Sequence, residues 1–155
     1  MKVRLLTVSN RQPPWVLEGV ATYEKRLPRS WQFQLVEIKP QARTSGADAR
    51  KVLLGEAARI RQALPKNAIV VALDERGEPW STETFADRLE QWQQVGRDLA
   101  FVIGGADGFD PELRQAADHR LALSSMVMPH GLVRVMFVEQ LYRASTLIDG
   151  HPYHK

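Results

Sequence analysis

The last six residues of the sequence, GHPYHK (150–155), bring together side chains that can bind a metal ion or transfer a proton. His151 and His154 have H-x-x-H spacing, but Asp149 is the only carboxylate beside them, and a structural zinc site takes four ligands. We therefore predict no metal site. The tail is either a loosely ordered end or part of a functional site.

A glycine-rich segment, GGADGFDP (104–111), directly follows a strongly apolar run. Gly104, Gly105 and Gly108 would let backbone groups approach a ligand closely, or would simply form a turn; both interpretations stand. The segment SNRQPPW (9–15) contains no glycine, and the chain lacks G-K-[ST] and G-x-S-x-G. The sequence therefore argues against a dinucleotide fingerprint, a Walker loop and a hydrolase nucleophile elbow.

A third segment, SSMVMPHG (124–131), precedes a very apolar helix. Ser124 and Ser125 could hydrogen-bond a ligand or satisfy a turn. Met126 and Met128 could pack on a flat ring or fill the core, which is the commoner fate of methionine.

The helix predicted at 132–148 is apolar nearly all round, which indicates burial on more than one side, often by a partner subunit. Glu139 and Arg143 form an i,i+4 pair. Arg134 has no acidic residue three or four positions away, so it is either a functional charge or an arginine that is solvated or paired elsewhere.

Alternating strands and helices should position these segments. Strands are predicted at 2–8, 33–38, 68–73, 99–103 and 120–123. Helices are predicted from Pro13 or Pro14 to before Pro28, and at 47–64, 81–95 (Ser81 as N-cap), 111–117 and 132–148. This order indicates an α/β fold, a mostly parallel sheet with helices on both faces. Ligands bind such sheets at the carboxyl ends of strands, here after Leu73, Ile103 and Leu123.

Composition limits the class of protein. The 155 residues are 44% hydrophobic and 25% charged, which is typical of one soluble domain spanning 1–155. The chain has no cysteine, and no segment resembles a signal peptide or a membrane helix, so we expect a cytoplasmic protein without membrane contact. The net charge of +3 is compatible with nucleic-acid binding without requiring it.

Four stretches together resemble one known family: ALDERGEPWST (72–82), FVIGGADGFDP (101–111), LALSSMVMPHGLVRVMFVEQLYRA (121–144) and GHPYHK. The chain is similar to the SPOUT class of methyltransferases, and within it to the RlmH (YbeA-like) family of 23S ribosomal RNA pseudouridine N3-methyltransferases. It departs from that family in reading GGADG for G-G-P-E-G, LSSMVMPH for L-S-x-L-T-L-P-H, and Gly131 for a frequent proline. Its loop at 42–48, ARTSGAD, is less basic than usual.

The resemblance implies a homodimer whose C-terminal elements form a trefoil knot, with S-adenosyl-L-methionine as cofactor and no metal. It implies methylation of N3 of a pseudouridine in the helix 69 loop of 23S rRNA, on the assembled ribosome. The implied cofactor-binding residues are Leu73, Gly104, Leu123, Ser124, Ser125, Met126, Val127 and Met128.

The groups available for catalysis near the implied site are His130, Arg134, Tyr153 and His154. We hypothesise that Tyr153 and His154 contact the target base and assist its deprotonation, over a partner's cofactor pocket. Arg134 would steady the developing anion or a phosphate.

Two rival hypotheses are a Rossmann-like oxidoreductase, which the absence of glycine from the first loop disfavours, and a non-catalytic RNA-binding ribosome assembly factor with a vestigial pocket. The retained glycines and the LSSMVMPH segment disfavour the second rival.

Overall fold

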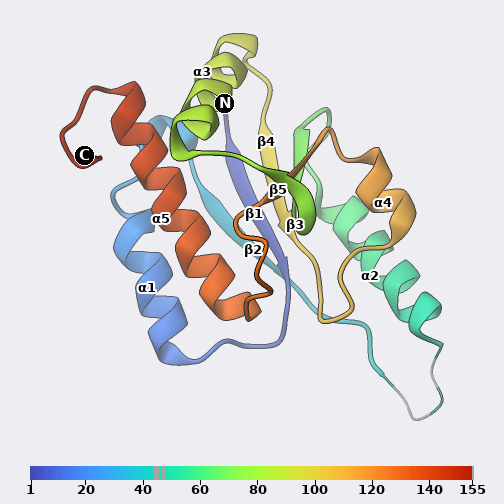
Figure 1. Ribbon diagram of the computed structural model, residues 1–155. Coiled ribbons are helices and arrows are strands. Elements are labelled where there is room, and N and C mark those ends of the chain that lie inside the picture. Colours follow the sequence, from blue (N-terminus) through green and yellow to red (C-terminus); the bar gives the residue numbers. More distant parts are fainter. Residues whose placement is uncertain (44–45, 47, 155) are drawn as a thin grey trace.

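A wholly parallel five-stranded sheet forms the centre of the computed structural model, which describes residues 1–43, 46 and 48–154 (Figure 1). The strand order is β2-β1-β4-β3-β5. The strands are β1 (Val3–Val8), β2 (Gln34–Ile38), β3 (Ile69–Pro79), β4 (Leu99–Ile103) and β5 (His119–Ala122). The sheet confirms the fold class that the alternation of strands and helices predicts.

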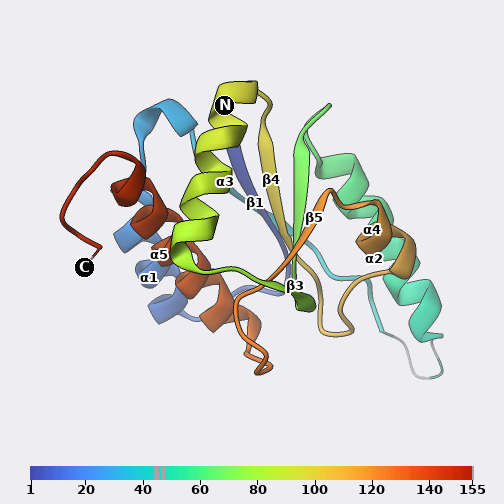
Figure 2. The ribbon, with the colours of Figure 1, turned by 45° about the horizontal axis from the view of Figure 1, so that its top comes forward.

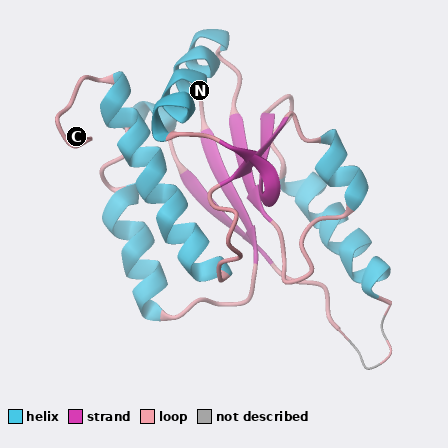
Figure 3. Cartoon of the chain, in the orientation of Figure 1, coloured by secondary structure: helices cyan, strands magenta, loops and turns pink. Residues whose placement is uncertain are grey.

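Helices cover both faces of the sheet (Figures 2 and 3). One layer contains α1 (Pro14–Glu24), α3 (Thr82–Val95) and α5 (His130–Ile148). The other contains α2 (Ala49–Ala63) and α4 (Pro111–Ala116). The helix expected to reach Pro28 ends earlier, and a short 3-10 turn, Arg29–Trp31, follows it.

Strand side chains alternate between two cores because successive residues of a strand point to opposite faces. Leu5 and Phe101 pack toward α1, α3 and α5, whereas Leu6 and Val102 pack toward α2 and α4. Every residue of β4 is buried, which fits a strand in the middle of a sheet covered on both faces.

Helix α5 is apolar because its own chain covers most of it. It packs against the sheet and contacts both α1 and α3. Its second buried side therefore needs no partner subunit to explain it. Leu132 and Met136 on α5 stay 38% exposed each, and on α1 Trp15 and Leu17 are 56% and 37% exposed.

Strand β3 is longer than the sequence predicts. It was expected to end at Leu73 but continues to Pro79. Leu73 and Glu78 both pair with Leu121 of β5, so the register shifts, as at a β-bulge, between these two residues, and β3 approaches β5 twice. Gly77 permits this approach, because a Cβ atom there would lie 2.6 Å from the backbone carbon of Arg120.

Gly150 ends α5. Gly150 has a φ of +68°, and its N–H donates to the carbonyl of Leu147 at 3.2 Å. The N–H of His151 donates to Thr146 at 2.8 Å, which completes a Schellman motif. Of the described helices, none is long and apolar enough to cross a membrane.

Ser81 is the N-cap of α3, as predicted: its Oγ accepts a hydrogen bond from the N–H of Thr84 at 3.0 Å. We expect Ser81→Ala to lower the free energy of unfolding by about 1 kcal/mol, because that N–H loses its partner. Urea denaturation measures the change. Ser81→Asp should keep most of the stability, and an equal loss in both variants would contradict a capping role.

Candidate functional site

A cavity of about 270 Å³ opens at the carboxyl ends of β3, β4 and β5. Its walls come from β3, from the segments that follow β4 and β5, from α4 and from the start of α5. They include 73–76, 103–109, Arg114, Leu121, Leu123, Ser124, 126–128, His130 and Val133. The cavity thus lies at the edge of the sheet where the alternation of elements places a ligand.

Seven of the eight residues expected to bind a cofactor line this cavity. They are Leu73, Gly104, Leu123, Ser124, Met126, Val127 and Met128; Ser125 is not among the lining residues. Met126 and Val127 are 75% and 82% exposed, so Met126 does not fill the core, the commoner fate of methionine. Ser124 forms a turn, since its Oγ accepts from the N–H of Met126 at 3.0 Å.

The glycine loop, residues 104–108, is a tight turn that also lines the cavity. The N–H of Gly108 donates to the carbonyl of Gly105 at 2.9 Å, and Gly108 has a φ of +81°. A Cβ atom on Gly104 would lie 2.8 Å from the carbonyl oxygen of Gly108. The observed turn is therefore compatible with both interpretations of these glycines: they form a tight turn, and that turn can also contact a ligand.

Asp74 is a lining residue that the sequence analysis missed. It is buried, and its Oδ2 accepts from Arg114 Nε at 2.5 Å while its Oδ1 accepts from the N–H of Arg76 at 3.0 Å. An aspartate directly after a buried strand was the pattern that could have identified it. The ion pair joins β3 to α4 and so fixes one wall of the cavity.

His130, the first residue of α5, lines the cavity. Burial, followed by the positive charge of Arg134, lowers the pKa of His130 below its ordinary value, although Glu56 and Glu75 oppose this. The imidazole is therefore neutral at pH 7.

The lowered pKa of His130 makes folding stability depend on pH. As the pH falls through about 6.5, the unfolded chain binds more protons than the folded chain, so stability should decrease. His119, whose pKa burial also lowers, adds a change of the same sign. Urea denaturation from pH 7.5 to 5 measures this, and His130→Gln should flatten the curve. An unchanged slope in that variant would count against the assignment.

Arg134 does not line the cavity. Its side chain is 1% exposed and donates to Glu37 Oε1 at 3.2 Å, Thr7 Oγ1 at 3.0 Å and Ser9 Oγ at 2.7 Å. The structure therefore shows an arginine paired through the tertiary fold, which was one of the alternatives. It joins α5 to the carboxyl ends of β1 and β2.

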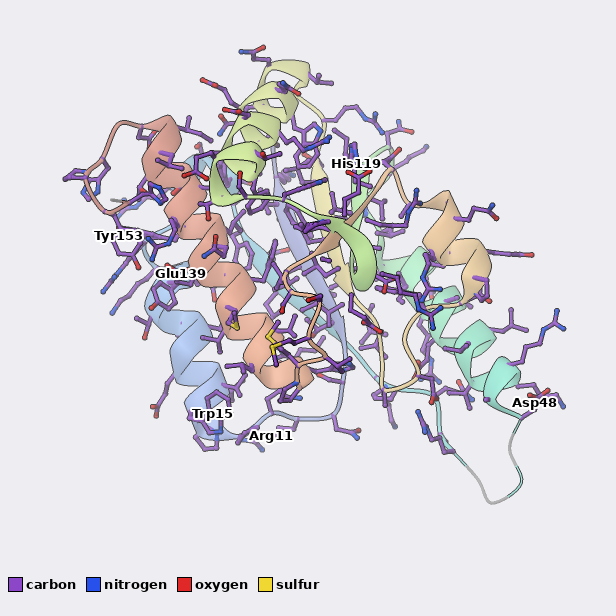
Figure 4. All side chains as sticks on the ribbon, in the orientation of Figure 1. Arg11, Trp15, Asp48, His119, Glu139 and Tyr153 are labelled. Carbon is purple, nitrogen blue, oxygen red and sulfur yellow. The ribbon has the colours of Figure 1, made fainter. Side chains whose placement is uncertain are left out.

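Tyr153 lies near the C-terminal end of α5 (Figure 4), and His154 follows it in the chain, whereas the cavity lies at the N-terminal end of α5. A 19-residue helix is about 28 Å long, so neither side chain reaches the cavity of its own chain. The Tyr153 ring stacks on Tyr142 with 4.6 Å between centroids, and its hydroxyl donates to Glu139 Oε1 at 3.2 Å. Burial and the Glu139 charge raise the pKa of Tyr153.

The rest of the tail gives no metal site among the described residues. His154 Nε2 lies 3.3 Å from Glu83 Oε1, and no group of three or more His, Asp or Glu side chains in 1–43, 46 and 48–154 is placed to hold an ion. Lys155 and three residues of the 42–48 loop, Thr44, Ser45 and Ala47, lie outside the described residues.

The chain is similar to known methyltransferases over its whole length. A family model described as "Predicted SPOUT methyltransferase" matches residues 1–154. A protein of Paraburkholderia xenovorans (strain LB400), "Ribosomal RNA large subunit methyltransferase H", is 51% identical over 155 residues, covering 100% of this chain and 99% of the relative. A protein of the same name from Burkholderia vietnamiensis (strain G4) has the same identity and coverage.

A solved structure, "a probable methylase family protein from Haemophilus influenzae Rd KW20", resembles the chain with a TM-score of 0.59. The sequence identity is 11%, and the match covers 99% of this chain and 70% of the other. At this identity the likeness concerns the fold alone.

Proposed function

This chain belongs to the SPOUT methyltransferase family, and within it to the RlmH group; from that premise we propose that it methylates RNA of the large ribosomal subunit with S-adenosylmethionine as methyl donor. The finer proposal is transfer to N3 of a pseudouridine in the helix 69 loop of 23S rRNA, on the assembled ribosome in the cytoplasm. The full-length relatives named for large-subunit RNA methylation support the coarser proposal.

The cavity carries the proposal, because its residues fit the cofactor. Leu73, Leu123 and Val127 give apolar walls, and the glycine loop brings backbone groups to the surface of the cavity. Glu75 adds a carboxylate that suits a positively charged ligand, whereas the carboxylate of Asp107 is already paired with Arg43. When bound, S-adenosylmethionine supplies a methyl group on a positively charged sulfur. The cavity residues would orient that ligand and keep water away, which is a task of alignment.

The target nitrogen carries a proton that must leave, so methyl transfer needs a base or a stabilising cation. His130 is neutral at pH 7 and lines the cavity, so its imidazole can accept a proton there. We propose that Tyr153 and His154 of a second copy contact the target base and assist this step. Their distance from their own cavity supports a site built by two subunits.

A homodimer is part of this proposal. Trp15, Leu132 and Met136 expose apolar surface on the layer of α1 and α5, where a second copy could cover it. Such a partner would bring its tail toward the cavity at the other end of α5. Arg134 is held by Glu37, so we propose that it acts on the site only through the position of α5.

Transfer of labelled methyl groups tests the function directly. Intact ribosomes, free large subunits and deproteinised RNA are incubated with the chain and labelled S-adenosylmethionine, and the modified nucleotide is then mapped. We expect one modified pseudouridine, with the ribosome as the best substrate. A chain that binds ribosomes but neither binds S-adenosylmethionine nor transfers label would instead be the non-catalytic assembly factor.

A further inference from the structure

Glu56, on α2, is a buried carboxylate that the proposed chemistry does not use. It is 5% exposed, and none of the described cations lies within ion-pair distance of it. Among the described residues, one hydrogen bond reaches it, from the backbone N–H of Gln41, which donates to Oε2 at 3.1 Å. A buried charge without a cation lowers stability, so its position needs an explanation.

Two glycines make room for this carboxylate and its neighbour. A Cβ atom on Gly105 would lie 2.6 Å from Glu56 Oε1, and one on Gly55 would lie 2.7 Å from Gln41 Oε1. Neither glycine has a positive φ, so the backbone conformation does not require them. The glycines instead provide space, because they have no Cβ atom. The Glu56 side chain occupies the space at Gly105.

The same contacts join two loops. Gly105 begins the turn that its carbonyl and the N–H of Gly108 close, and that turn lines the cavity. Gln41 belongs to the segment between β2 and α2. A second link, the Arg43–Asp107 ion pair, connects this segment to the same turn. Glu56 thus lies where α2, the segment after β2 and the glycine loop meet.

We propose that Glu56 is a positioning residue for the cofactor cavity: its carboxylate braces the glycine loop at Gly105 and fixes that loop against the segment held through Gln41. The inference rests on the proposed function, because it assigns the brace to the binding of S-adenosylmethionine. The carboxylate acts through the loop and does not line the cavity.

The charge of Glu56 also affects His130, a residue that lines the cavity. Among the groups that face His130, Glu56 and Glu75 raise its pKa, against burial and the cation of Arg134. Glu56→Gln keeps the shape and an oxygen for the Gln41 N–H but removes the charge. That variant should therefore lower the pKa of His130, as measured by NMR titration, while the brace persists.

A double-mutant cycle on the full-length chain tests the brace, with S-adenosylmethionine affinity measured by calorimetry. We expect Glu56→Ala and Gly105→Ala each to weaken binding about tenfold, the first by freeing the loop and the second by displacing it. The double variant should bind no worse than either single variant, because each change removes the same contact. Glu56→Gln should bind within about threefold of the wild type. Gln62→Ala, exposed on the same helix, is the matched control.

The outcomes separate the two proposals. Single effects that multiply to about a hundredfold in the double variant, or a Glu56→Ala chain that binds like Gln62→Ala, would overturn the brace. Thermal unfolding shows which variants are folded. If Glu56→Ala does not fold, the loss of S-adenosylmethionine affinity in Gly105→Ala is measured instead. Adding Glu56→Ser to Gly105→Ala should then restore that affinity, and no recovery would overturn the brace. Failure of the wild-type chain to bind S-adenosylmethionine would overturn the proposed function itself.

Discussion

Removal of residues 151–155 is expected to abolish methyl transfer while the chain keeps its fold and its affinity for S-adenosylmethionine. The tail contains Tyr153 and His154, and the cavity lies at the other end of α5. Groups that move a proton typically contribute about 10²–10⁴-fold to a rate, so turnover on ribosomes should fall at least about a hundredfold. Single-turnover assays measure the rate, and calorimetry measures the affinity.

The truncation should lower stability modestly. It removes the stacking of Tyr153 on Tyr142, worth about 0.5–1.5 kcal/mol, and its hydrogen bond to Glu139. It also removes the hydrogen bond from the N–H of His151 to Thr146 and the contact of His154 with Glu83. Tyr153→Phe and His154→Ala separate the two side chains. Full turnover in both single variants would contradict the catalytic part of the proposal. If the truncated chain loses S-adenosylmethionine affinity and turnover together, the tail has a structural role instead.

Mixing two inactive chains tests whether the tail serves a partner. One chain lacks 151–155, and the other carries Gly104→Val, which obstructs the glycine loop because even a Cβ atom would lie 2.8 Å from Gly108 O. If the tail acts on a partner's cavity, a mixed dimer contains one complete site and regains activity. If it acts in its own chain, every mixture stays inactive.

The elements that hold the site could be predicted because they depend on local patterns. The run at 99–103 is apolar throughout and is β4 without a residue of difference, and Ser81 was predictable as a cap from its place before a helical period. The end of β3 was not predictable in this way. Residues 74–79 read as a polar loop, but β3 continues through them and pairs again with β5 at Glu78 and Pro79.

The candidate site, too, could be predicted where it depends on local patterns but not where it depends on residues distant in the sequence. Residues directly after apolar strands could be placed at the cavity, since parallel strands end at one edge of a sheet. The surroundings of Arg134 could not be predicted, because Glu37 and Thr7 lie 97 and 127 positions away in the sequence. The absence of an acid three or four positions away on its own helix left a functional charge as one interpretation, but the acid that pairs with it is on β2.

Glu37→Ala is expected to destabilise the chain more than removal of Arg134 itself. The Arg134 side chain is 1% exposed and the Glu37 side chain 44% exposed, so only the carboxylate can be hydrated in place. Without Glu37, the guanidinium stays buried with two hydroxyl partners and no counter-charge. The free energy of unfolding should fall by about 3 kcal/mol, as urea denaturation would measure.

Arg134→Met removes the buried cation and leaves Glu37 free to be hydrated, so it should cost less than Glu37→Ala, about 1–2 kcal/mol for the lost hydrogen bonds. The double variant should then resemble Arg134→Met, because Glu37 matters only while the cation is present. The turnover of the folded fraction distinguishes a structural role of Arg134 from a catalytic one. If Arg134 only positions α5, Glu37→Ala and Arg134→Met should lower turnover to a similar extent. If Arg134 is catalytic, only Arg134→Met should lower it. Stability unchanged in Glu37→Ala would show that the hydroxyls of Thr7 and Ser9 suffice to hold the charge.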